Sequence, residues 1–358
     1  MNLLKNRAFC VLPFIQEFQG VNGVRRVCCY SNIPIDTINS VETNALRQQI
    51  LEGNPIPNCQ SCYKLEQNNT ISPRIRESIS WLRDPEIKSY IENWSPEKLQ
   101  TFYYDIRFDN KCNLACISCG PNSSSLWEKE LGQTKSTLLP KLDIDRLLTA
   151  KKLYLAGGEP LIIDQFKDLL QAVAAQSVQP EIVINTNLTR VSNEIAQTLG
   201  QIKNLTLTVS VDAFEKVNEY HRWPIRWDKF MRNLEWAKEI GCTIHFNSVV
   251  DAVTVININQ LVKIEHLADM WTLSNLIHPP ALCVNNLPND LKPEITQRFE
   301  KIKLSRFYNQ DPVFRSQTDA VITSIAQPGE PELLSMYIDQ IDRRRQLDHV
   351  RYLGIKLT

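Results

Sequence analysis

The stretch TFYYDIRFDNKCNLACISC, residues 101–119, decides how the rest of the chain is interpreted. Its first part, Thr101–Phe108, is rich in aromatic and β-branched residues and predicts a β-strand. Three cysteines follow in the spacing C-x3-C-x2-C: Cys112, Cys116 and Cys119. Three soft thiolates in one tight loop suit an iron–sulfur cluster or zinc, but zinc would want a fourth protein ligand. A cluster held by only three cysteines keeps one iron open for a substrate or cofactor.

Strand-like and helical stretches alternate after residue 101. The expected strands are Thr101–Phe108, Lys152–Ala156, Glu181–Asn185, Leu205–Val211, Thr243–Val250 and Trp271–Ile277. The expected helices between them are Ser123–Leu131, Ile163–Ala175, Ser192–Leu199, Trp227–Ile240 and Ile258–Met270. Six such alternations predict an α/β fold with a parallel sheet, either open and doubly wound or a partial barrel. From Leu291 onward the pattern is helical, and Arg343-Arg344-Arg345 is expected on a solvated helix face.

Three further motifs end the next three expected strands, in order: Ala156-Gly157-Gly158-Glu159-Pro160, Asn185-Thr186-Asn187 and Ser210-Val211-Asp212-Ala213. Together with the cysteine loop, they resemble the ordered motifs of radical S-adenosylmethionine (SAM) enzymes, namely CxxxCxxC, GGEP, "TN" and "SxD". The resemblance implies a partial (β/α)6 barrel over roughly residues 100–285. One position departs from the family pattern, because Ser118 stands where an aromatic residue usually precedes the third cysteine.

The resemblance also implies a cofactor site. The amino and carboxylate groups of SAM would fill the open iron of a [4Fe-4S] cluster held by the three cysteines. Ligands bind at the carboxyl ends of parallel strands, where all of these motifs lie. The adjacent glycines would let the backbone approach the methionine amine, because no side chain intervenes. The residues expected to contact SAM are Gly157, Gly158, Glu159, Pro160, Asn187, Ser210 and Asp212.

A second group of cysteines lies near the N-terminus, in the pattern Cys10-x12-Gly23-x4-Cys28 followed by Cys59-x2-Cys62. This pattern resembles the twitch domain, the first half of the SPASM motif, which holds one auxiliary [4Fe-4S] cluster. The phrase CQSCYKLE, residues 59–66, also resembles radical SAM proteins in which the twitch comes first. The spacing selects Cys28 over its neighbour Cys29 as a ligand. A structural zinc ribbon is the alternative.

Domain boundaries follow from these assignments. We expect a small twitch domain with a linker helix over residues 1–98, the partial barrel over 99–288, and a helical C-terminal extension over 289–358. A segment crowded with proline and glycine can hardly build a large core alone, so a metal-stapled N-terminal domain is the economical interpretation.

Composition excludes several classes of protein. The chain of 358 residues has 40 Lys plus Arg and 40 Asp plus Glu, so its net charge is zero and a basic nucleic-acid-binding surface is not expected. No apolar run approaches the roughly 18 residues of a membrane span, and the N-terminus does not read as a signal peptide. We therefore expect a cytoplasmic protein without a membrane partner, whose cysteines are reduced and bind metal rather than form disulfides.

Two cysteines remain outside both groups. Cys242 precedes the strand Thr243–Val250 and is expected at its amino end, as a small buried hydrophobe. Cys283 follows Pro279-Pro280 after the last expected strand, which places it on the carboxyl side with SAM. It is either a packed thiol or a catalytic one. The sequence leaves open whether His221, His245 and His278 line the cavity.

Radical SAM enzymes with SPASM or twitch modules mostly modify ribosomally made peptides, so the resemblance implies a precursor peptide with a leader as substrate. An electron donor such as flavodoxin or ferredoxin is implied for reductive cleavage of SAM. Removal of a Cα hydrogen and its return from Cys283 would give a D-residue, as in peptide epimerases. The alternatives are a thioether or carbon–carbon cyclophane crosslink, or backbone splicing. A non-catalytic iron–sulfur carrier is disfavoured, because a carrier needs no SAM pocket.

Overall fold

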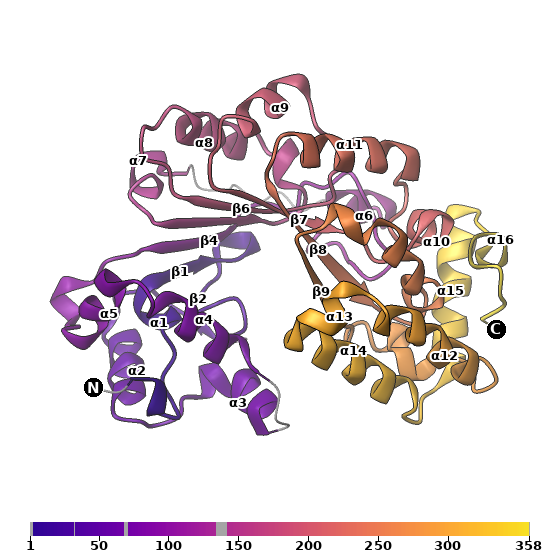
Figure 1. Cartoon of the computed structure of the whole chain (residues 1–358), viewed down its shortest axis with the longest axis horizontal. Helices are drawn as coiled ribbons and strands as arrows, with labels where there is room; N and C mark the ends of the chain where they lie inside the picture. The colour runs from indigo at the N-terminus through magenta and orange to yellow at the C-terminus, as the bar shows by residue number, and fades with distance from the viewer. Residues whose placement is uncertain (1–2, 32, 68–70, 134–141, 358) are drawn as a thin grey trace. The chain divides into compact units, whose positions relative to one another are not determined.

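The chain divides into two compact units in the computed structural model, which describes residues 3–31, 33–67, 71–133 and 142–357 (Figure 1). The first unit comprises Met1–Asp109, Ser136–Gly157 and Asp168–Val183. The second comprises Asn110–Lys135, Gly158–Lys167 and Ile184–Thr358. Each unit is therefore assembled from segments that lie far apart in the sequence.

A mixed sheet organises the first unit. Its strand order is β3 (Pro34–Ile35), β2 (Arg25–Arg26), β1 (Gln16–Gln19), β4 (Tyr103–Arg107) and β5 (Lys152–Ala156). Strand β4 runs parallel to β1 and β5, whereas β2 is antiparallel to both β1 and β3. The sequence did not indicate β1, because its four residues, QEFQ, include one apolar side chain and show no run that marks a strand.

The helices of the first unit are short. The α-helices are α1 (Leu12–Ile15), α2 (Val41–Leu51), α3 (Gln60–Gln67), α4 (Pro73–Trp81), α5 (Pro85–Glu92) and α7 (Ile144–Leu147), and the 3-10 helices are η1 (Leu3–Lys5), η2 (Val21–Gly23), η3 (Pro57–Cys59) and η4 (Pro96–Lys98). One apolar cluster joins Phe9, Phe14 and Ile87 of the N-terminal segment to Phe102 and Tyr103 at the start of β4. The N-terminal segment thus shares its core with the sheet instead of building one alone.

Three parallel strands order the second unit: β7 (Leu205–Ser210), β8 (Thr243–Val250) and β9 (Met270–Asn275). Around them lie α6 (Ser125–Glu130), α9 (Asn193–Leu199), α10 (Glu215–His221), α11 (Trp227–Glu239), α12 (Lys292–Lys303), α13 (Arg306–Gln310), α14 (Pro312–Ile325), α15 (Pro331–Arg345) and α16 (His349–Leu353). The 3-10 helices are η5 (Pro160–Ile162), η6 (Thr254–Ile256), η7 (Ile258–Leu267), η8 (Pro280–Leu282) and η9 (Val284–Asn286). Helices α12 to α16 gather at the C-terminal end of the chain, where α14 packs on β9 and α15 packs on η8 and η9 (Figure 1).

The expected alternation is confirmed. Strand β6 (Glu181–Thr186) and helix α8 (Asp164–Ala174) complete it, and each contains a point where the chain passes from one unit to the other. The expected strands and helices match the observed ones within two residues at nearly every end. The mixed α/β class with parallel strands and a helical C-terminal part is therefore established.

One expected helix has a different geometry. Residues Ile258–Leu267 form a 3-10 helix instead of the α-helix expected over Ile258–Met270, and Met270 already belongs to β9. The apolar residues here recur every third position, at Ile258, Leu261 and Ile264, and all three are buried. A spacing of three matches the 3-10 period of three residues per turn, so this helix buries one straight apolar edge.

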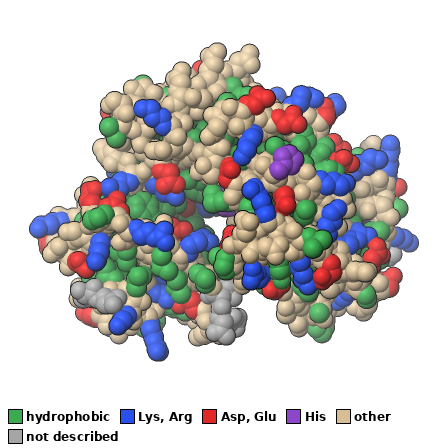
Figure 2. Space-filling model, in the orientation of Figure 1, with side chains coloured by type: hydrophobic (Ala, Val, Ile, Leu, Met, Phe, Trp, Pro, Cys, Tyr) green, Lys and Arg blue, Asp and Glu red, His purple; other side chains and the backbone are tan. Residues whose placement is uncertain are grey.

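The surface has no single-sign charge. Figure 2 shows acidic and basic side chains interspersed over the face in view, in keeping with the zero net charge of the chain. Within the described residues, no helix is both long enough and apolar enough to cross a membrane.

Candidate functional site

The three clustered cysteines lie in a loop between β4 and α6 that polar side chains hold in place. The Ser125 hydroxyl accepts a hydrogen bond from the Cys112 amide at 3.1 Å and donates to its carbonyl at 3.2 Å. Ser124 caps helix α6 and donates to the Leu114 carbonyl at 2.5 Å. Helix α6 therefore begins at Ser125, two residues after the expected start at Ser123, and Ser124 and Ser125 form hydrogen bonds with the cysteine loop.

A charged side chain, Arg222, contacts Cys116. The Arg222 guanidinium donates to its sulfur at 3.6 Å. A hydrogen bond from the Cys119 thiol lowers the pKa of Cys116 against the effect of burial, and Arg222 lowers it further. These contacts favour the thiolate, which is the form that ligates metal.

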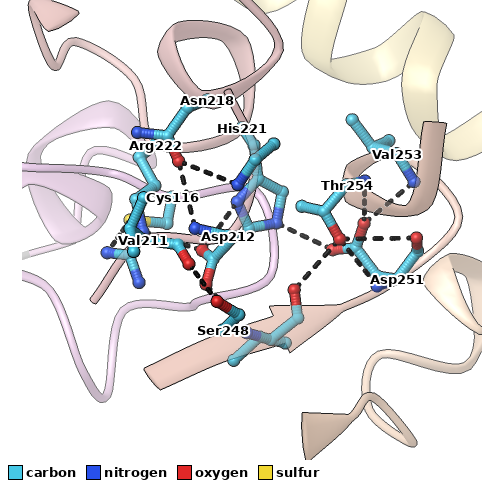
Figure 3. Close-up of polar contacts among 12 residues, drawn as sticks. Cys116, Val211, Asp212, Asn218, His221, Arg222, Ser248, Asp251, Val253 and Thr254 are labelled. Atoms are coloured by element: carbon cyan, nitrogen blue, oxygen red, sulfur yellow. Dashed lines mark hydrogen bonds and ion pairs between the residues drawn. The ribbon is translucent and has the colours of Figure 1, made fainter. Parts of the chain in front are cut away.

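Arg222, Asp212, His221 and Asp251 contact one another in that order and form a buried ion-pair chain (Figure 3). The Arg222 Nε atom lies 2.7 Å from Asp212 Oδ2, and His221 Nδ1 lies 3.1 Å from the same oxygen. The other ring nitrogen of His221 lies 2.7 Å from Asp251 Oδ2. His221 is fully buried, and Asp212 and Asp251 are almost so.

These contacts set the charge of each group. Burial opposes ionisation of Asp212, but Arg222 and His221 lower the pKa of this carboxyl to about 2. Burial likewise opposes protonation of His221, but Asp251 and Asp212 raise its pKa to about 10. His221 is therefore a cation held between two carboxylates at neutral pH, and Asp212 is not a free helix cap.

The two glycines of the GGEP motif permit a close approach of two backbone segments. A Cβ on Gly158 would stand 2.3 Å from the Lys111 carbonyl oxygen, and the Glu159 amide donates to that oxygen at 2.8 Å. A Cβ on Gly157, whose φ is +135°, would stand 2.6 Å from the Asp109 carbonyl oxygen. The segment that carries the motif is thus packed directly against the residues that precede Cys112. Contact of the glycines with SAM stays a prediction.

Glu159 is engaged within the protein. Its Oε1 accepts from the Leu161 amide at 3.1 Å and the Thr186 hydroxyl at 2.7 Å, and its Oε2 accepts from the Asn187 amide at 2.6 Å. Burial raises the pKa of this carboxyl to about 7. The carboxylate therefore positions the end of β6, and Pro160, which follows it, opens the buried helix η5.

The end of β6 in turn reaches the cysteine loop. The Asn187 amide group donates to the Cys112 sulfur at 3.9 Å and to Asn113 Oδ1 at 3.2 Å. Thr189 closes this network, because it donates to Asn187 and accepts from Asn113. Ser210, at the end of β7, lies 3.5 Å from Asn185. The structure thus brings Asn187, Asp212 and the cysteine loop together, as the order of motifs indicated.

Sequence reasoning missed the part played by helix α15. The Tyr337 hydroxyl donates to the Ile117 carbonyl at 2.7 Å, and Arg345 donates to the Ala115 carbonyl at 2.7 Å. Arg345 also forms a two-point ion pair with Glu130, with distances of 2.9 and 3.0 Å. The expectation of a solvated arginine face is wrong for Arg345, whose side chain is only 1% exposed. It holds for Arg343, which is exposed.

The other residues missed by sequence reasoning are Arg222 and Asp251. Asp251 directly follows β8, so the rule that ligands gather at the carboxyl ends of parallel strands would have found it. Arg222 follows helix α10, which the sequence did not predict, and carried no signal of its own. His221 is resolved as part of the ion-pair chain, whereas His245 contacts Thr272 at 2.6 Å and His278 is exposed.

The two remaining cysteines lie where the strand order predicted. Cys242 is buried just before β8 and donates to the Ala237 carbonyl at 3.2 Å. Cys283 lies beyond the other end of β8, between η8 and η9, and is partly exposed. Burial, and then the charge of Asp251, raise the pKa of the Cys283 thiol. The amide of Ala252, which follows Asp251, donates to the carbonyl of Leu282, which precedes Cys283, at 2.9 Å, so the Cys283 segment packs against the segment that carries Asp251.

The N-terminal cysteines are assembled in the first unit. Cys10, Cys28, Cys59 and Cys62 are all buried, and besides burial the charges of the other three raise the pKa of the Cys10 thiol. The other three cysteines therefore lie within electrostatic range of Cys10. Burial raises the pKa of the Cys59 and Cys62 thiols, and Arg74, which donates to the Phe9 carbonyl and pairs with Glu66, opposes this rise.

The two cysteine sets offer the soft thiolate donors that iron–sulfur clusters and zinc both use. Four thiolates on one zinc ion, at Zn–S distances of about 2.3 Å, stand only about 3.8 Å apart. Among the residues that the structure describes, no three cysteine sulfurs lie within 4.8 Å of one another. Wider spacing suits ligands that each bind a separate iron. The three-cysteine loop leaves one iron of a cubane without a protein thiolate, whereas the four-cysteine set would occupy all four irons.

Comparison with known proteins locates a family over part of the chain. Residues 106–269 match the Radical SAM superfamily. A GTP 3',8-cyclase of Bradyrhizobium diazoefficiens is 27% identical over 169 residues, covering 44% of this chain and 46% of that protein. A GTP 3',8-cyclase of Mycolicibacterium smegmatis is 28% identical over 159 residues, covering 42% of each. The chain thus spans about half the length of the curated relatives it matches.

Two solved structures are also similar. Native anSMEcpe with bound AdoMet has 18% identity and a TM-score of 0.39, covering 55% of this chain and 57% of that one. Streptococcus suis SuiB bound to the precursor peptide SuiA has 15% identity and a TM-score of 0.40, covering 74% and 60%.

Proposed function

We propose that the chain is a radical SAM enzyme that matures a ribosomally made precursor peptide by converting L-residues to D-residues; the match of residues 106–269 to the Radical SAM superfamily supports the first part of this proposal. Cys112, Cys116 and Cys119 would hold the SAM-binding [4Fe-4S] cluster. Cys10, Cys28, Cys59 and Cys62 would hold an auxiliary [4Fe-4S] cluster, for electron relay or structural support. An electron donor such as flavodoxin or ferredoxin completes the system.

SAM, held with the cluster by the cysteine loop, would supply radical chemistry able to remove a hydrogen atom from the substrate. The protein's contribution is to fix the cysteine loop and the polar strand ends around that site. Asn187 and Ser210 would face the methionyl and ribose groups, whereas Asp212, whose carboxylate is held by Arg222, His221 and the Val249 amide, would position Arg222. Arg222 would balance the negative charge of the cluster, because it already donates to Cys116.

The observation that carries the epimerase proposal is the position of Cys283. It is a thiol outside both ligand sets and is partly exposed, and its neighbour Leu282 accepts a hydrogen bond from Ala252, the residue after Asp251 of the ion-pair chain that reaches Cys116. Its raised pKa keeps the S–H bond present at neutral pH, and that bond supplies the hydrogen. In this step the S–H bond breaks and a Cα–H bond forms, and one electron and one proton from the donor system then restore the thiol.

Two other functions compete with this proposal. A thioether or cyclophane crosslink, or backbone splicing, needs no thiol donor and would use the auxiliary cluster as oxidant. The curated relatives are GTP 3',8-cyclases, so GTP is a second substrate class to test. Neither alternative gives Cys283 a part.

The decisive experiment is co-expression with the neighbouring small open reading frame in D2O, followed by mass spectrometry of the peptide. Epimerisation adds deuterium at each converted Cα, whereas crosslinking removes two hydrogens in either solvent. The Cys283→Ala variant should still cleave SAM but deliver no solvent deuterium, and Cys242→Ala should match the unaltered enzyme. Full deuterium delivery by Cys283→Ala, or consumption of GTP in a parallel incubation, contradicts the proposal.

A further inference from the structure

One row of side chains crosses four strands of the first unit. The pairing registers align Arg26 of β2 with Phe18 of β1, Phe18 with Asp105 of β4, and Asp105 with Tyr154 of β5. Side chains at paired positions point to the same face of a sheet. Arg107, two residues beyond Asp105, lies on this face as well.

Two cations are held over one aromatic ring in this row. The Arg26 guanidinium lies 5.8 Å from the centroid of the Phe18 ring, and the Arg107 guanidinium lies 5.5 Å from it. Arg107 is also 5.9 Å from the Tyr154 ring. Phe18 is 2% exposed, so its ring is a fixed platform. Cation–π contacts of this kind orient guanidinium groups without neutralising them.

The row carries an excess of positive charge. Arg107 is paired with Asp105 through Nε at 3.4 Å, its side chain is 36% exposed, and Asp105 is 1% exposed. No ion pair or hydrogen bond joins the Arg26 side chain to another of the described residues, and its Nε is buried without an acceptor. A buried donor without a partner is costly and calls for an acceptor. The neighbouring acid Glu17 lies on the opposite face, where it pairs with Arg146.

The row also ends beside the expected cofactor motif. Arg107 is aligned with Ala156, the last residue of β5, and Gly157 follows at once. In parallel sheets this carboxyl end is where ligands bind. A group bound between Arg26 and Arg107 would therefore lie near Gly157, the first residue of the GGEP motif, which belongs to the same unit.

We propose that Arg26 and Arg107 bind an anionic group of the substrate, a carboxylate of the peptide. The inference rests on the proposed peptide substrate and adds that the peptide is acidic near the modified residue or at its terminus. A guanidinium binds phosphate oxygens by the same geometry, so a nucleotide is the other source of this chemistry.

The test compares three probes on the full-length, cluster-loaded protein by isothermal titration: an acetylated tetraglutamate peptide, the matched tetraglutamine peptide and GTP. The variants are Arg26→Gln, Arg26→Lys and the control Arg25→Gln. Arg25 is the adjacent residue of β2, so its side chain lies on the opposite face of the sheet. Loss of one charge-assisted contact should weaken tetraglutamate about tenfold in Arg26→Gln.

The affinity of Arg26→Lys for tetraglutamate should lie between those of the unaltered protein and Arg26→Gln, because lysine keeps the charge but lacks the two-pronged hydrogen-bonding geometry of a guanidinium. Arg25→Gln should bind tetraglutamate with the affinity of the unaltered protein. The tetraglutamine peptide should bind to neither the unaltered protein nor any of the variants. Iron content and the unfolding midpoint of each variant verify that it is folded. Equal affinity of Arg26→Gln and Arg25→Gln for all probes overturns the anion site.

A stronger, Arg26-dependent affinity for GTP than for tetraglutamate supports the anion site but overturns the carboxylate assignment. The proposed function has its own separate test, in the deuterium experiment on the precursor peptide. The two proposals can therefore fail independently.

Discussion

Arg345, near the end of helix α15, donates to the main-chain carbonyl of Ala115 at 2.7 Å, across 230 residues of sequence. Ala115 immediately precedes Cys116, and its own amide donates to the Trp223 carbonyl at 2.7 Å. The C-terminal helices are thus part of the scaffold of the cysteine loop, which joins the cluster site to the end of the chain.

Replacement of Arg345 by Met should destabilise the second unit by about 3–5 kcal/mol, because Glu130 would keep a largely buried and unpaired charge. The measurement is urea unfolding under anaerobic conditions, together with retention of iron. Arg343→Met is the matched control, since its side chain is 79% exposed and its pair with Asp339 is long, at 3.8 Å. Equal stability of the two variants would show that the Arg345 contacts contribute little.

The number of clusters can be counted. Reconstituted protein should contain about eight irons per chain, as two cubanes. Cys28→Ser should lower this count toward four, whereas Cys29→Ser should leave it unchanged, although the two cysteines are adjacent. A count near four accompanied by zinc would favour the ribbon. Loss of iron in Cys29→Ser but not in Cys28→Ser would show that Cys29, and not Cys28, is the cluster ligand.

The cysteine loop should be necessary for SAM cleavage. Replacement of Cys112, Cys116 and Cys119 together by Ala should abolish 5′-deoxyadenosine formation, because no thiolates would remain to hold that cluster. The iron bound by the N-terminal cysteines should stay in place. Formation of 5′-deoxyadenosine at the normal rate by this variant would refute the assignment.

His221 should make stability depend on pH in the alkaline range. Its pKa in the folded protein is about 10, above the usual value of about 6.5. Between these values the folded state holds a proton that the unfolded state releases, so stability should fall as the pH rises, by at most about 1.4 kcal/mol per unit. The stabilisation is fully present below about pH 6.5.

The measurement is the urea midpoint from pH 6.5 to 9.5 for the unaltered protein, for His221→Gln and for the exposed control His278→Gln. His221→Gln should be less stable at pH 6.5, and its deficit should shrink as the pH rises. A deficit independent of pH would mean that His221 is neutral in the folded protein.

Gly329 fixes the loop that carries Cys283. A Cβ at this position would stand 2.0 Å from the Asn285 carbonyl oxygen, and the next amide, that of Glu330, donates to Asn286 at 2.8 Å. Gly329→Ala should push η9 away, cost about 1–3 kcal/mol and reduce D-residue formation more than SAM cleavage.

The matched control for Gly329 is Gly200→Ala, whose new methyl group would make contacts of 3.5 Å or more with the chain. Chiral analysis of the hydrolysed peptide gives D-residue formation, and chromatography of 5′-deoxyadenosine gives SAM cleavage. An equal loss of both in Gly329→Ala would assign the effect to general destabilisation and not to Cys283.

The sequence by itself determined the features that depend on local patterns. The spacing of Cys112, Cys116 and Cys119, and the polar motifs that end β5, β6 and β7, identify the candidate site because parallel strands bring their carboxyl ends to one edge. The bounds of β4 to β9 followed from short β-rich runs in the same way, whereas β1, β2 and β3 were not expected. The 3-10 period at Ile258, Leu261 and Ile264 was also present in the sequence, but it resembled an α-helix edge.

Only the tertiary structure decided the partners. Sheet register aligns Arg26 with Phe18 and Asp105. Register depends on pairing between segments that are distant in the sequence, so it could not be predicted from the four residues of β1, QEFQ. Helix docking likewise buries Arg345 against Glu130, although its neighbours in sequence are exposed arginines. A charged side chain is buried where an oppositely charged side chain lies within ion-pair distance of it. The position of that second side chain is set by the folded structure and not by the local sequence.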